Sequence, residues 1–333
     1  MHCELIIPAL LSSALPAAAK ARHPALELLL ARGRRVSTES QTLEQWLHAA
    51  FEQPGEALAA GALSLAASGA SPGEAWWVRA DPVHLRLMRD RAIVAPAEAL
   101  EVAADEAGAL VEALNRHFSG VAEFVSLDAR RWVARVEPGT GASQGPALYS
   151  AGHGVTTARG EEAQRSALLT EIQMLLHAHP VNEAREARGE PALNSVWLWG
   201  GGQAPASAHG AWRSVAAADP SALGLAQLAG MRRFDAPPSA ETWLGWLPQD
   251  GRHLAVLDAL RAPAVLEQQA EYEQGVEALE RLWFAPLLRA LREQRIGMLT
   301  VRVPDADPGA AFETIRGDLR RFWRRPRAIA HYA

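Results

Sequence analysis

Apolar residues recur along this chain with helical spacing in some segments and as short runs in others. Pro24–Arg32 and Thr42–Phe51 both have apolar positions at helical spacing, and the first of these segments ends before Gly33. Short apolar runs at Glu4–Ile7 and Ser195–Trp199 predict buried strands. Because predicted helices alternate with short buried strands at both ends of the chain, we expect an α/β protein.

The same patterns predict the elements of the rest of the chain. Further helices are expected at Ala97–Phe118, at Glu161–His177, after a cap at Asn182, between Asp219 and Gly230, at Val265–Arg292 and at Phe312–Trp323. Further strands are expected at Ala75–Val78, in a hairpin of Ala122–Leu127 with Arg131–Val136, at Leu254–Leu257 and at Gly297–Val303. The longest of these helices should bend at Pro286, which lacks a backbone donor. The middle of the chain is more α+β in character.

Composition narrows the possible function classes without identifying one. The 333 residues are enough for two domains, or for one large core with an insertion. A formal net charge of −5 gives no overall reason to expect nucleic acid or an anionic membrane as a partner. The single cysteine, Cys3, excludes a disulfide framework and a cysteine-based metal site within this sequence.

The apolar stretch Leu5–Ala19 ends in small residues, as a signal peptide does. However, no Lys or Arg precedes it, Glu4 stands at its start, and two prolines interrupt it. A buried first strand explains the stretch better. No segment has about eighteen uncharged apolar residues in a row, so we expect no membrane span and a cytoplasmic protein.

Three consecutive glycines, Gly200–Gly202, follow the predicted strand that ends at Trp199. Gln203 comes next, whereas a phosphate-binding P-loop needs a lysine that holds the phosphates. A dinucleotide-binding turn needs a further glycine where Pro205 stands. The run therefore predicts a tight turn, with a nest of backbone N–H groups that binds an anion as the alternative.

Four side chains could supply a metal site. His177 and His179 are two residues apart, which suits one side of a strand, and Asp81 and His84 are three apart, which suits a helical turn. His179 precedes a proline, however, and we expect it in a turn. The alternative is that these histidines are buried and hydrogen-bonded to the backbone.

The C-terminal segment Arg316–Arg327 places six arginines around Phe322 and Trp323. Such a mixture can bind nucleic acid or an acidic partner. It is also typical of an amphipathic terminal helix whose aromatic residues dock while its arginines stay in water. Because Lys20 is the only lysine, arginine is this chain's general basic residue, and we expect the terminal helix.

The segment "HPVNEAREARGEPALNSVWLWGGGQAP" (His179–Pro205) resembles a segment of archaeal-type, cofactor-independent phosphoglycerate mutases, with a His-Pro-Val-Asn turn, a basic helix and a Trp-Leu-Trp-Gly strand in that order. "LGLAQLAGM" (Leu223–Met231) is similar to the helix that follows in that family, and "HPALELLLARG" (His23–Gly33) to its Thr-Pro-Asn-Leu-Asp helix. The chain resembles more closely a bacterial group of RpfE-type regulatory, phosphoglycerate-mutase-like proteins, through "WVRADPVHLR", "EIQMLLHAHPVN" and "FWRRP". This resemblance spans most of the chain.

The resemblance implies an alkaline-phosphatase-like, three-layer α/β core interrupted by an inserted α+β domain. We place the first part of the core at residues 1–73, the insertion at residues 74–190 and the second part of the core at residues 191–333. In the mutases the core holds two divalent metals and a serine nucleophile, and the metals neutralise a phosphate and lower the pKa of the nucleophile. That chemistry uses an Asp after the first strand, an Asp-x-x-x-His pair and a later Asp-His.

This sequence departs from the family at each of those positions. Pro8 stands after the first strand where the Asp is expected. Asp258 has no histidine after it until the last residues of the sequence, and Asp305 is not followed by a histidine. Ser12 and Ser13 could be nucleophiles by position, but no metal-ligating residue stands beside them.

We therefore expect a degenerate phosphoglycerate-mutase-like protein without two-metal phosphoryl-transfer chemistry, without cofactor or metal, and with a regulatory, ligand-binding or partner-binding role. The alternative is an active mutase or phosphatase with a rearranged metal site. A small phosphorylated metabolite or a protein is the expected partner; a membrane is not, and Arg316–Arg327 is the one candidate surface for nucleic acid. No catalytic residue is assigned. The candidate ligand-binding residues are His177, His179, Asn182, Arg185, Asn194, Trp197, Trp199, Gly200, Gly201, Gly202, Asp81 and His84. The structural alternative is that Asn182 is a helix cap and that Arg185 lies on a solvated face.

Overall fold

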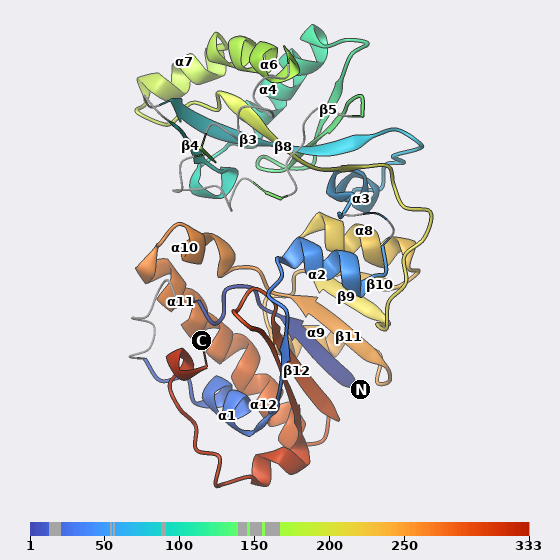
Figure 1. The fold of residues 1–333 in the computed structure, drawn as a ribbon, viewed down its shortest axis with the longest axis vertical. Coiled ribbons are helices and arrows are strands. Elements are labelled where there is room, and N and C mark those ends of the chain that lie inside the picture. Colours follow the sequence, from blue (N-terminus) through green and yellow to red (C-terminus); the bar gives the residue numbers. More distant parts are fainter. Residues whose placement is uncertain are drawn as a thin grey trace. The chain divides into compact units, whose positions relative to one another are not determined.

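The computed structural model describes residues 1–12, 21–53, 55, 57–87, 91–138, 145–146, 155–156 and 167–332. The chain divides into two units (Figure 1): a core unit, Met1–Gln53 with Ser207–Ala333, and an inserted unit, Pro54–Ala206. The boundaries predicted after residues 73 and 190 differ from these. Helix α3 (Ala60–Ala67) and strand β8 (Ser195–Gly202) belong to the inserted unit, because both pack on its strand β3 (Trp77–Leu87).

The core unit is built on a seven-stranded sheet with the strand order β10-β9-β11-β1-β12-β13-β2. The strands are β1 (His2–Ile6), β2 (Arg34–Thr38), β9 (Ser214–Ala217), β10 (Arg232–Asp235), β11 (Arg252–Val256), β12 (Met298–Val303) and β13 (Gly309–Ile315). The strands from β10 to β12 in this order are parallel, and β13 is antiparallel to both of its neighbours. The carboxyl ends of the parallel strands therefore lie at one edge of the sheet, where ligands bind in α/β proteins.

Helices cover both faces of this sheet, which gives the core unit three layers (Figure 1). Helices α1 (Pro24–Arg32), α9 (Ala240–Trp246), α11 (Gln269–Leu279) and α12 (Ala285–Arg292) share one hydrophobic core with residues of the central strands. The connections through α8 (Pro220–Leu228) and α9 run in opposite directions along the sheet, and right-handed crossovers then place them on opposite faces. Helix α2 (Leu43–Ala50) shares the face of α8, and the short α10 (Arg261–Val265) follows β11. The predicted three-layer α/β core is confirmed.

The inserted unit has the predicted α+β character. Its sheet has the order β5-β6-β3-β4-β7, and β8 pairs with β3. Besides β3 and β8, the strands are β4 (Arg91–Ala95), β5 (Glu123–Ser126), β6 (Trp132–Arg135) and β7 (Val155–Thr156). Helices α4 (Ala104–His117) and α6 (Ala167–His177) pack on one face of the sheet, α7 (Pro180–Ala187) follows α6, and α3 packs against β3 and β8 with Ala62 and Leu65.

Three predicted helices differ from the structure. The predicted helix Ala97–Phe118 is a 3-10 turn (Ala97–Ala99) followed by α4, whose acidic first turn marks the real start. The predicted helix Val265–Arg292 is interrupted after α10, and α11 continues through a π-helical turn (Glu280–Phe284) into α12 beside Pro286. Residues 161–166 of the predicted helix Glu161–His177 lie outside the described residues.

The predicted terminal helix Phe312–Trp323 is wrong. Strand β13 runs to Ile315, and a 3-10 turn (Arg316–Arg320) follows it. Phe, Thr and Ile are strand-forming residues, and β13 fills the place between β12 and β2, so pairing on both sides decides the conformation.

Cys3 lies in the central strand β1, between β11 and β12, and is fully buried. Burial raises the pKa of its thiol to about 12. Within the described residues, no helix combines the length and the apolar character needed to cross a bilayer.

Candidate functional site

The three glycines are the end of strand β8, so the predicted tight turn is wrong. Arg79 of β3 pairs with Trp199, and Trp77 pairs with Gly202, so Gly200 and Gly201 together oppose a single residue of β3. This is a β-bulge, and Gly200 takes the left-handed conformation that such a bulge needs, with a φ of 58°.

Close packing against α3 requires glycine at two of these positions. A Cβ at Gly200 would lie 2.6 Å from the Cβ of Ala60, and a Cβ at Gly202 would lie 2.6 Å from the Cβ of Ala59. Real side chains do not approach so closely, so the glycines let the start of α3 lie directly on the strand. The space that a phosphate would need beside these glycines is filled by protein.

Asp81 is part of a buried polar cluster in the inserted unit. Its Oδ1 accepts from Arg79 Nη2 at 2.6 Å and from the backbone N of Trp132 at 3.2 Å, and its Oδ2 accepts from Trp199 Nε1 at 2.7 Å. The Arg79 guanidinium also lies 5.1 Å from the centroid of the Trp199 ring. Asp81 and Trp199 therefore hold the sheet together and are not open to a ligand.

The four side chains that could have supplied a metal site do not come together in the described structure. Asp81 and His84 lie on one strand, not on a helical turn, and a spacing of three then puts them on opposite faces. His84 Nδ1 lies 2.9 Å from the carbonyl oxygen of Ala192. This is the contact with the backbone that the alternative interpretation of the histidines predicts. His177 is exposed at the end of α6, and His179 caps α7 by accepting from the Val181 backbone N.

Asn182 and Arg185 also have structural partners, although neither matches its prediction. Asn182 lies inside α7 and not at its cap: its Nδ2 donates to the carbonyls of Leu176 and Leu193, and its Oδ1 accepts from the Leu193 backbone N at 2.7 Å. Arg185 was expected on a solvated face but is 1% exposed, and its guanidinium forms an ion pair with Glu106 at 2.5 Å. Both side chains fix α7 to its surroundings.

Asn194 and Trp197 are the remaining candidate ligand-binding residues. The side-chain amide of Asn194 accepts from the backbone N of Leu85 at 2.7 Å and donates to its carbonyl at 2.9 Å, as a neighbouring strand would. Trp197 Nε1 donates to the carbonyl of Gly145 at 3.0 Å. Apart from the exposed His177, the candidates of this region therefore act in packing and backbone pairing.

Polar residues whose role the sequence motifs did not reveal lie at the carboxyl edge of the core sheet. Asp305 follows β12, and both of its carboxylate oxygens accept from the backbone N of Ala9, which follows β1, at 2.9 and 2.8 Å. Tyr272 of α11 donates from its hydroxyl to the carbonyl of Ala9 at 2.7 Å. Ala9 has a φ of 63°, a strained conformation for a residue with a Cβ. Asp305 and Tyr272 thus hold this strained turn from both sides. We call Ala9, Asp305 and Tyr272 together the edge bracket.

Asp305 is exposed at the surface, but desolvation by the protein around its carboxylate raises its pKa above the ordinary value, against the opposing effects of its backbone hydrogen bonds and of Arg261. Arg261 is itself paired with Glu44 at 2.8 Å. Burial raises the pKa of Tyr272 to about 12. The edge bracket is therefore a hydrogen-bonded structure that holds the turn at Ala9.

These residues do not fit a two-metal centre. Such a centre needs several deprotonated oxygen and nitrogen donors that converge on one point. Pro8 offers no side-chain donor, and both oxygens of Asp305 are directed to the Ala9 amide. Across the described ranges, no group of three or more His, Cys, Asp and Glu side chains has a geometry that could hold a metal ion. Ser12 closes a turn onto the Ala9 carbonyl, and Ser13 lies outside the described residues.

Glu4 is a further residue whose role the sequence patterns did not reveal, and its carboxylate is fully buried in the middle of β1. It pairs with Arg252 at 2.9 Å and with Arg302, and it accepts from Trp212 Nε1 at 2.9 Å. These contacts hold the pKa of Glu4 below its ordinary value, against the desolvation that would raise it. An acidic residue between Cys3 and Leu5 in a buried strand is the signal that could have revealed this cluster.

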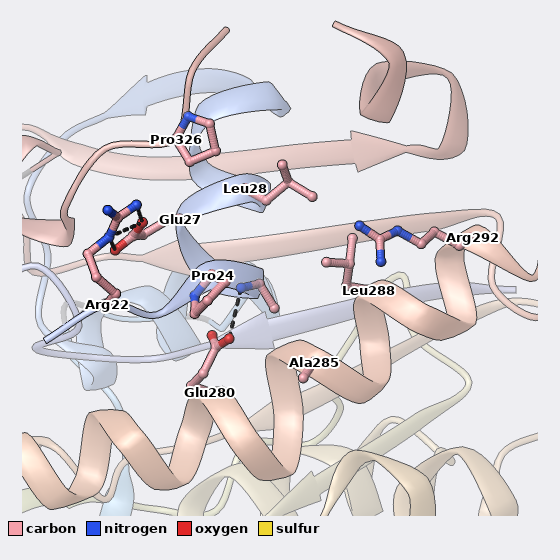
Figure 2. Close-up of a pocket in the computed structure, with 10 residues that line it drawn as sticks. Arg22, Pro24, Glu27, Leu28, Glu280, Ala285, Leu288, Arg292 and Pro326 are labelled. Carbon is pink, nitrogen blue, oxygen red and sulfur yellow. Dashed lines mark hydrogen bonds and ion pairs between the residues drawn. The ribbon is translucent and has the colours of Figure 1, made fainter. Parts of the chain in front are cut away.

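A pocket of about 480 Å³ lies at the start of α1, between that helix and α12 (Figure 2). Figure 2 shows Glu280 beneath the first turn of α1, where its carboxylate accepts from the backbone N of Ala25 at 2.8 Å. Glu27 is paired with Arg22 at 2.6 Å. Both carboxylates of the pocket are thus already engaged, which leaves Arg292 at its rim as an exposed cation.

Two solved structures are similar to this chain. A Pyrococcus horikoshii protein, PH0037, is covered over 86% of its length by 94% of this chain, with 13% identity and a TM-score of 0.58. A cofactor-independent phosphoglycerate mutase from Thermoplasma acidophilum is covered over 90% of its length by 95% of this chain, with 17% identity and a TM-score of 0.39. No family model and no curated protein sequence matches the chain. The likeness to the first structure is one of fold alone.

Proposed function

We propose that this chain is a degenerate phosphoglycerate-mutase-like protein, which has kept the fold for a binding or regulatory role and does not perform two-metal phosphoryl transfer. The edge bracket carries the proposal. At the sheet edge where the resemblance implies metal ligands, Asp305 holds the Ala9 backbone N–H with both oxygens.

A carboxylate binds a divalent metal in its deprotonated form and with free lone pairs. Both oxygens of Asp305 are occupied by the backbone donor of Ala9, and partial desolvation raises the pKa of its carboxyl group. Recruiting Asp305 to a metal would release the strained turn at Ala9, which the same carboxylate stabilises.

The test is a search for turnover together with the consequences of Asp305→Asn. We expect no conversion of 3-phosphoglycerate and no hydrolysis of an aryl phosphate with Mg²⁺, Mn²⁺, Co²⁺ or Zn²⁺. We also expect purified wild-type protein and Asp305→Asn to bind equally little divalent metal by elemental analysis, because Asp305 acts in structure. A known phosphoglycerate mutase in the same assay is the positive control.

Two outcomes would overturn this proposal. One is turnover that a chelator abolishes and that Asp305→Asn removes. The other is stoichiometric divalent metal in the wild-type protein that is lost from Asp305→Asn but kept in Asp250→Asn, whose side chain is 77% exposed. Either result would establish an active site with rearranged ligands.

A further inference from the structure

Phe322 and Trp323 form an exposed aromatic pair near the C-terminal end of the core unit. Their side chains are 77% and 66% exposed, and their ring centroids are 5.2 Å apart with the rings nearly perpendicular. The sequence predicted that these rings would dock and the arginines would stay in water. The structure shows the reverse for the aromatic rings, and two large exposed aromatic side chains together are typical of an interaction surface.

Arginines of the same segment anchor it to α1. Arg321 Nη1 donates to the carbonyl of Arg32 at 3.2 Å, and Arg324 Nη1 donates to the carbonyl of Gly33 at 2.9 Å. Carbonyl groups at the end of a helix lack partners within the helix, so these guanidiniums satisfy them. Arg321 also pairs with the buried Asp318 at 2.8 Å. The aromatic pair is therefore displayed from an anchored segment.

The other arginines beside the pair remain available. Arg316, Arg320 and Arg325 are exposed, and their guanidiniums have no hydrogen-bond or ion-pair partner within the described residues. With Phe322 and Trp323 they form what we call the arginine–aromatic patch. It combines two apolar anchors with three positive charges that nothing in the described chain neutralises.

We propose that the arginine–aromatic patch binds an acidic segment of a partner protein, in which an aromatic or aliphatic side chain stands between carboxylates. Guanidinium groups bind carboxylates through paired hydrogen bonds, and Trp and Arg carry much of the energy of protein interfaces. This specifies the partner-binding role proposed above. The patch lies apart from the edge bracket in sequence and contacts, so either proposal can fail without the other.

Charge favours a protein segment over nucleic acid. The whole chain has a formal net charge of −5, so the three arginines of the patch belong to a chain that is acidic overall. A long nucleic acid would bring many phosphates into the field of this acidic chain, whereas a short acidic segment can end within the patch.

The test uses two synthetic, fluorescein-labelled peptides, one with glutamates around two phenylalanines and one with serines in place of the phenylalanines. Fluorescence anisotropy with the full chain should show at least about tenfold tighter binding of the phenylalanine peptide, which corresponds to about 1.4 kcal/mol. A thymidine oligonucleotide of equal length should displace it only at a much higher concentration.

Two variants separate the parts of the patch. Phe322→Ser with Trp323→Ser should weaken binding of the phenylalanine peptide about tenfold and keep its salt dependence, because the charges remain. Arg316→Gln with Arg320→Gln and Arg325→Gln should weaken binding to a similar degree and remove most of the salt dependence. The control, Trp246→Ser with Arg289→Gln, changes an aromatic residue that is 40% exposed and an exposed arginine elsewhere on the core unit, and should bind as wild type.

Circular dichroism and thermal unfolding of each variant establish that it is folded. The proposal is overturned if folded patch variants bind as tightly as the wild type, or if the serine peptide binds as well as the phenylalanine peptide. It is also overturned if the oligonucleotide displaces the peptide at an equal or lower concentration, which would assign the patch to nucleic acid.

Discussion

Asp81 in the inserted unit and Asp305 in the core unit both accept hydrogen bonds from backbone N–H groups, yet Asp81 is buried within strand β3 and Asp305 is exposed after strand β12. Asp81 also meets a guanidinium and an indole N–H. Asp305 accepts from the backbone N of Ala9 and has no ion-pair partner in the described part of the chain. Partial desolvation raises the pKa of Asp305.

The difference teaches that acidic residues must be judged by their burial and their partners and not by the motif that contains them. Asp81 lies in the "WVRADPVHLR" segment that suggested a metal site, but its charge is compensated by a buried arginine and it serves the fold. Asp305 stands where the family's Asp-His is expected, but its carboxylate forms no ion pair within the described residues and instead holds the strained turn at Ala9.

The largest effect should follow from breaking the Asp81 pair. Asp81→Ala leaves Arg79, whose side chain is 4% exposed, without its carboxylate, and we expect the free energy of unfolding to fall by about 3–5 kcal/mol. Urea unfolding followed by tryptophan fluorescence measures it. Glu112→Ala, which removes the exposed pair with Arg116, should cost less than about 1 kcal/mol. Equal losses in the two variants would contradict our assignment of Asp81 to a structural charge pair.

The next effect concerns the bulge that places Trp199 on Asp81. Gly200→Ala combines a left-handed backbone with a clash against Ala60, and we expect a loss of about 2–4 kcal/mol in urea unfolding. Gly189→Ala is the matched control, because Gly189 has a φ of 77° but open space around its Cβ position. It should cost about 1–2 kcal/mol. If the two glycines tolerated alanine equally, close packing of α3 would not be the reason for the glycine run.

The smallest effect is expected at Asp305. Asp305→Asn keeps an acceptor for the Ala9 N–H and removes a charge that partial desolvation disfavours, and because Asp305 is exposed and screened by solvent, stability at pH 7 should rise by less than about 1 kcal/mol. Because the pKa of Asp305 is raised in the folded state, its contribution is fully present below the ordinary value of 3.8 and is lost as pH rises through the raised value.

Urea midpoints of the wild type and Asp305→Asn measured between about pH 4 and pH 7 test this sign, because the other titrating groups cancel in the difference. The wild type should lose stability relative to Asp305→Asn as pH rises over that interval. A difference that stays constant with pH, or that changes in the opposite direction, would contradict a raised pKa. Asp250→Asn, at an exposed site, provides the comparison.

Local sequence signals predicted those elements whose ends are determined locally. Helix α1 has the predicted bounds, Pro24–Arg32, because a proline opens it and Gly33 ends it. Asp219 caps α8 as predicted, through a hydrogen bond from the Ala222 backbone N. Strand β13 was mistaken for a helix because its conformation depends on β12 and β2, which flank it in the sheet but not in the local sequence pattern.

The candidate site was harder to predict, because the residues that contact one another there are far apart in the sequence. The sequence showed that Asp305 lacks a histidine neighbour, but not that its oxygens hold the backbone of Ala9, 296 positions earlier. The glycine run predicted a tight turn, because the residues that pack against it, Ala59 and Ala60, lie far upstream in the chain. Motifs show which groups are present, whereas partners that are distant in sequence determine whether those groups are free.

Cys3 gives the core unit a built-in reporter of sheet opening. It is the only cysteine in the sequence, it lies in the strand at the centre of the sheet, and burial raises the pKa of its thiol to about 12. A thiol reagent requires both access and thiolate, and the closed sheet provides neither. The rate at which Cys3 is alkylated in the unmodified protein therefore measures how often β1 separates from its neighbours, without an engineered label.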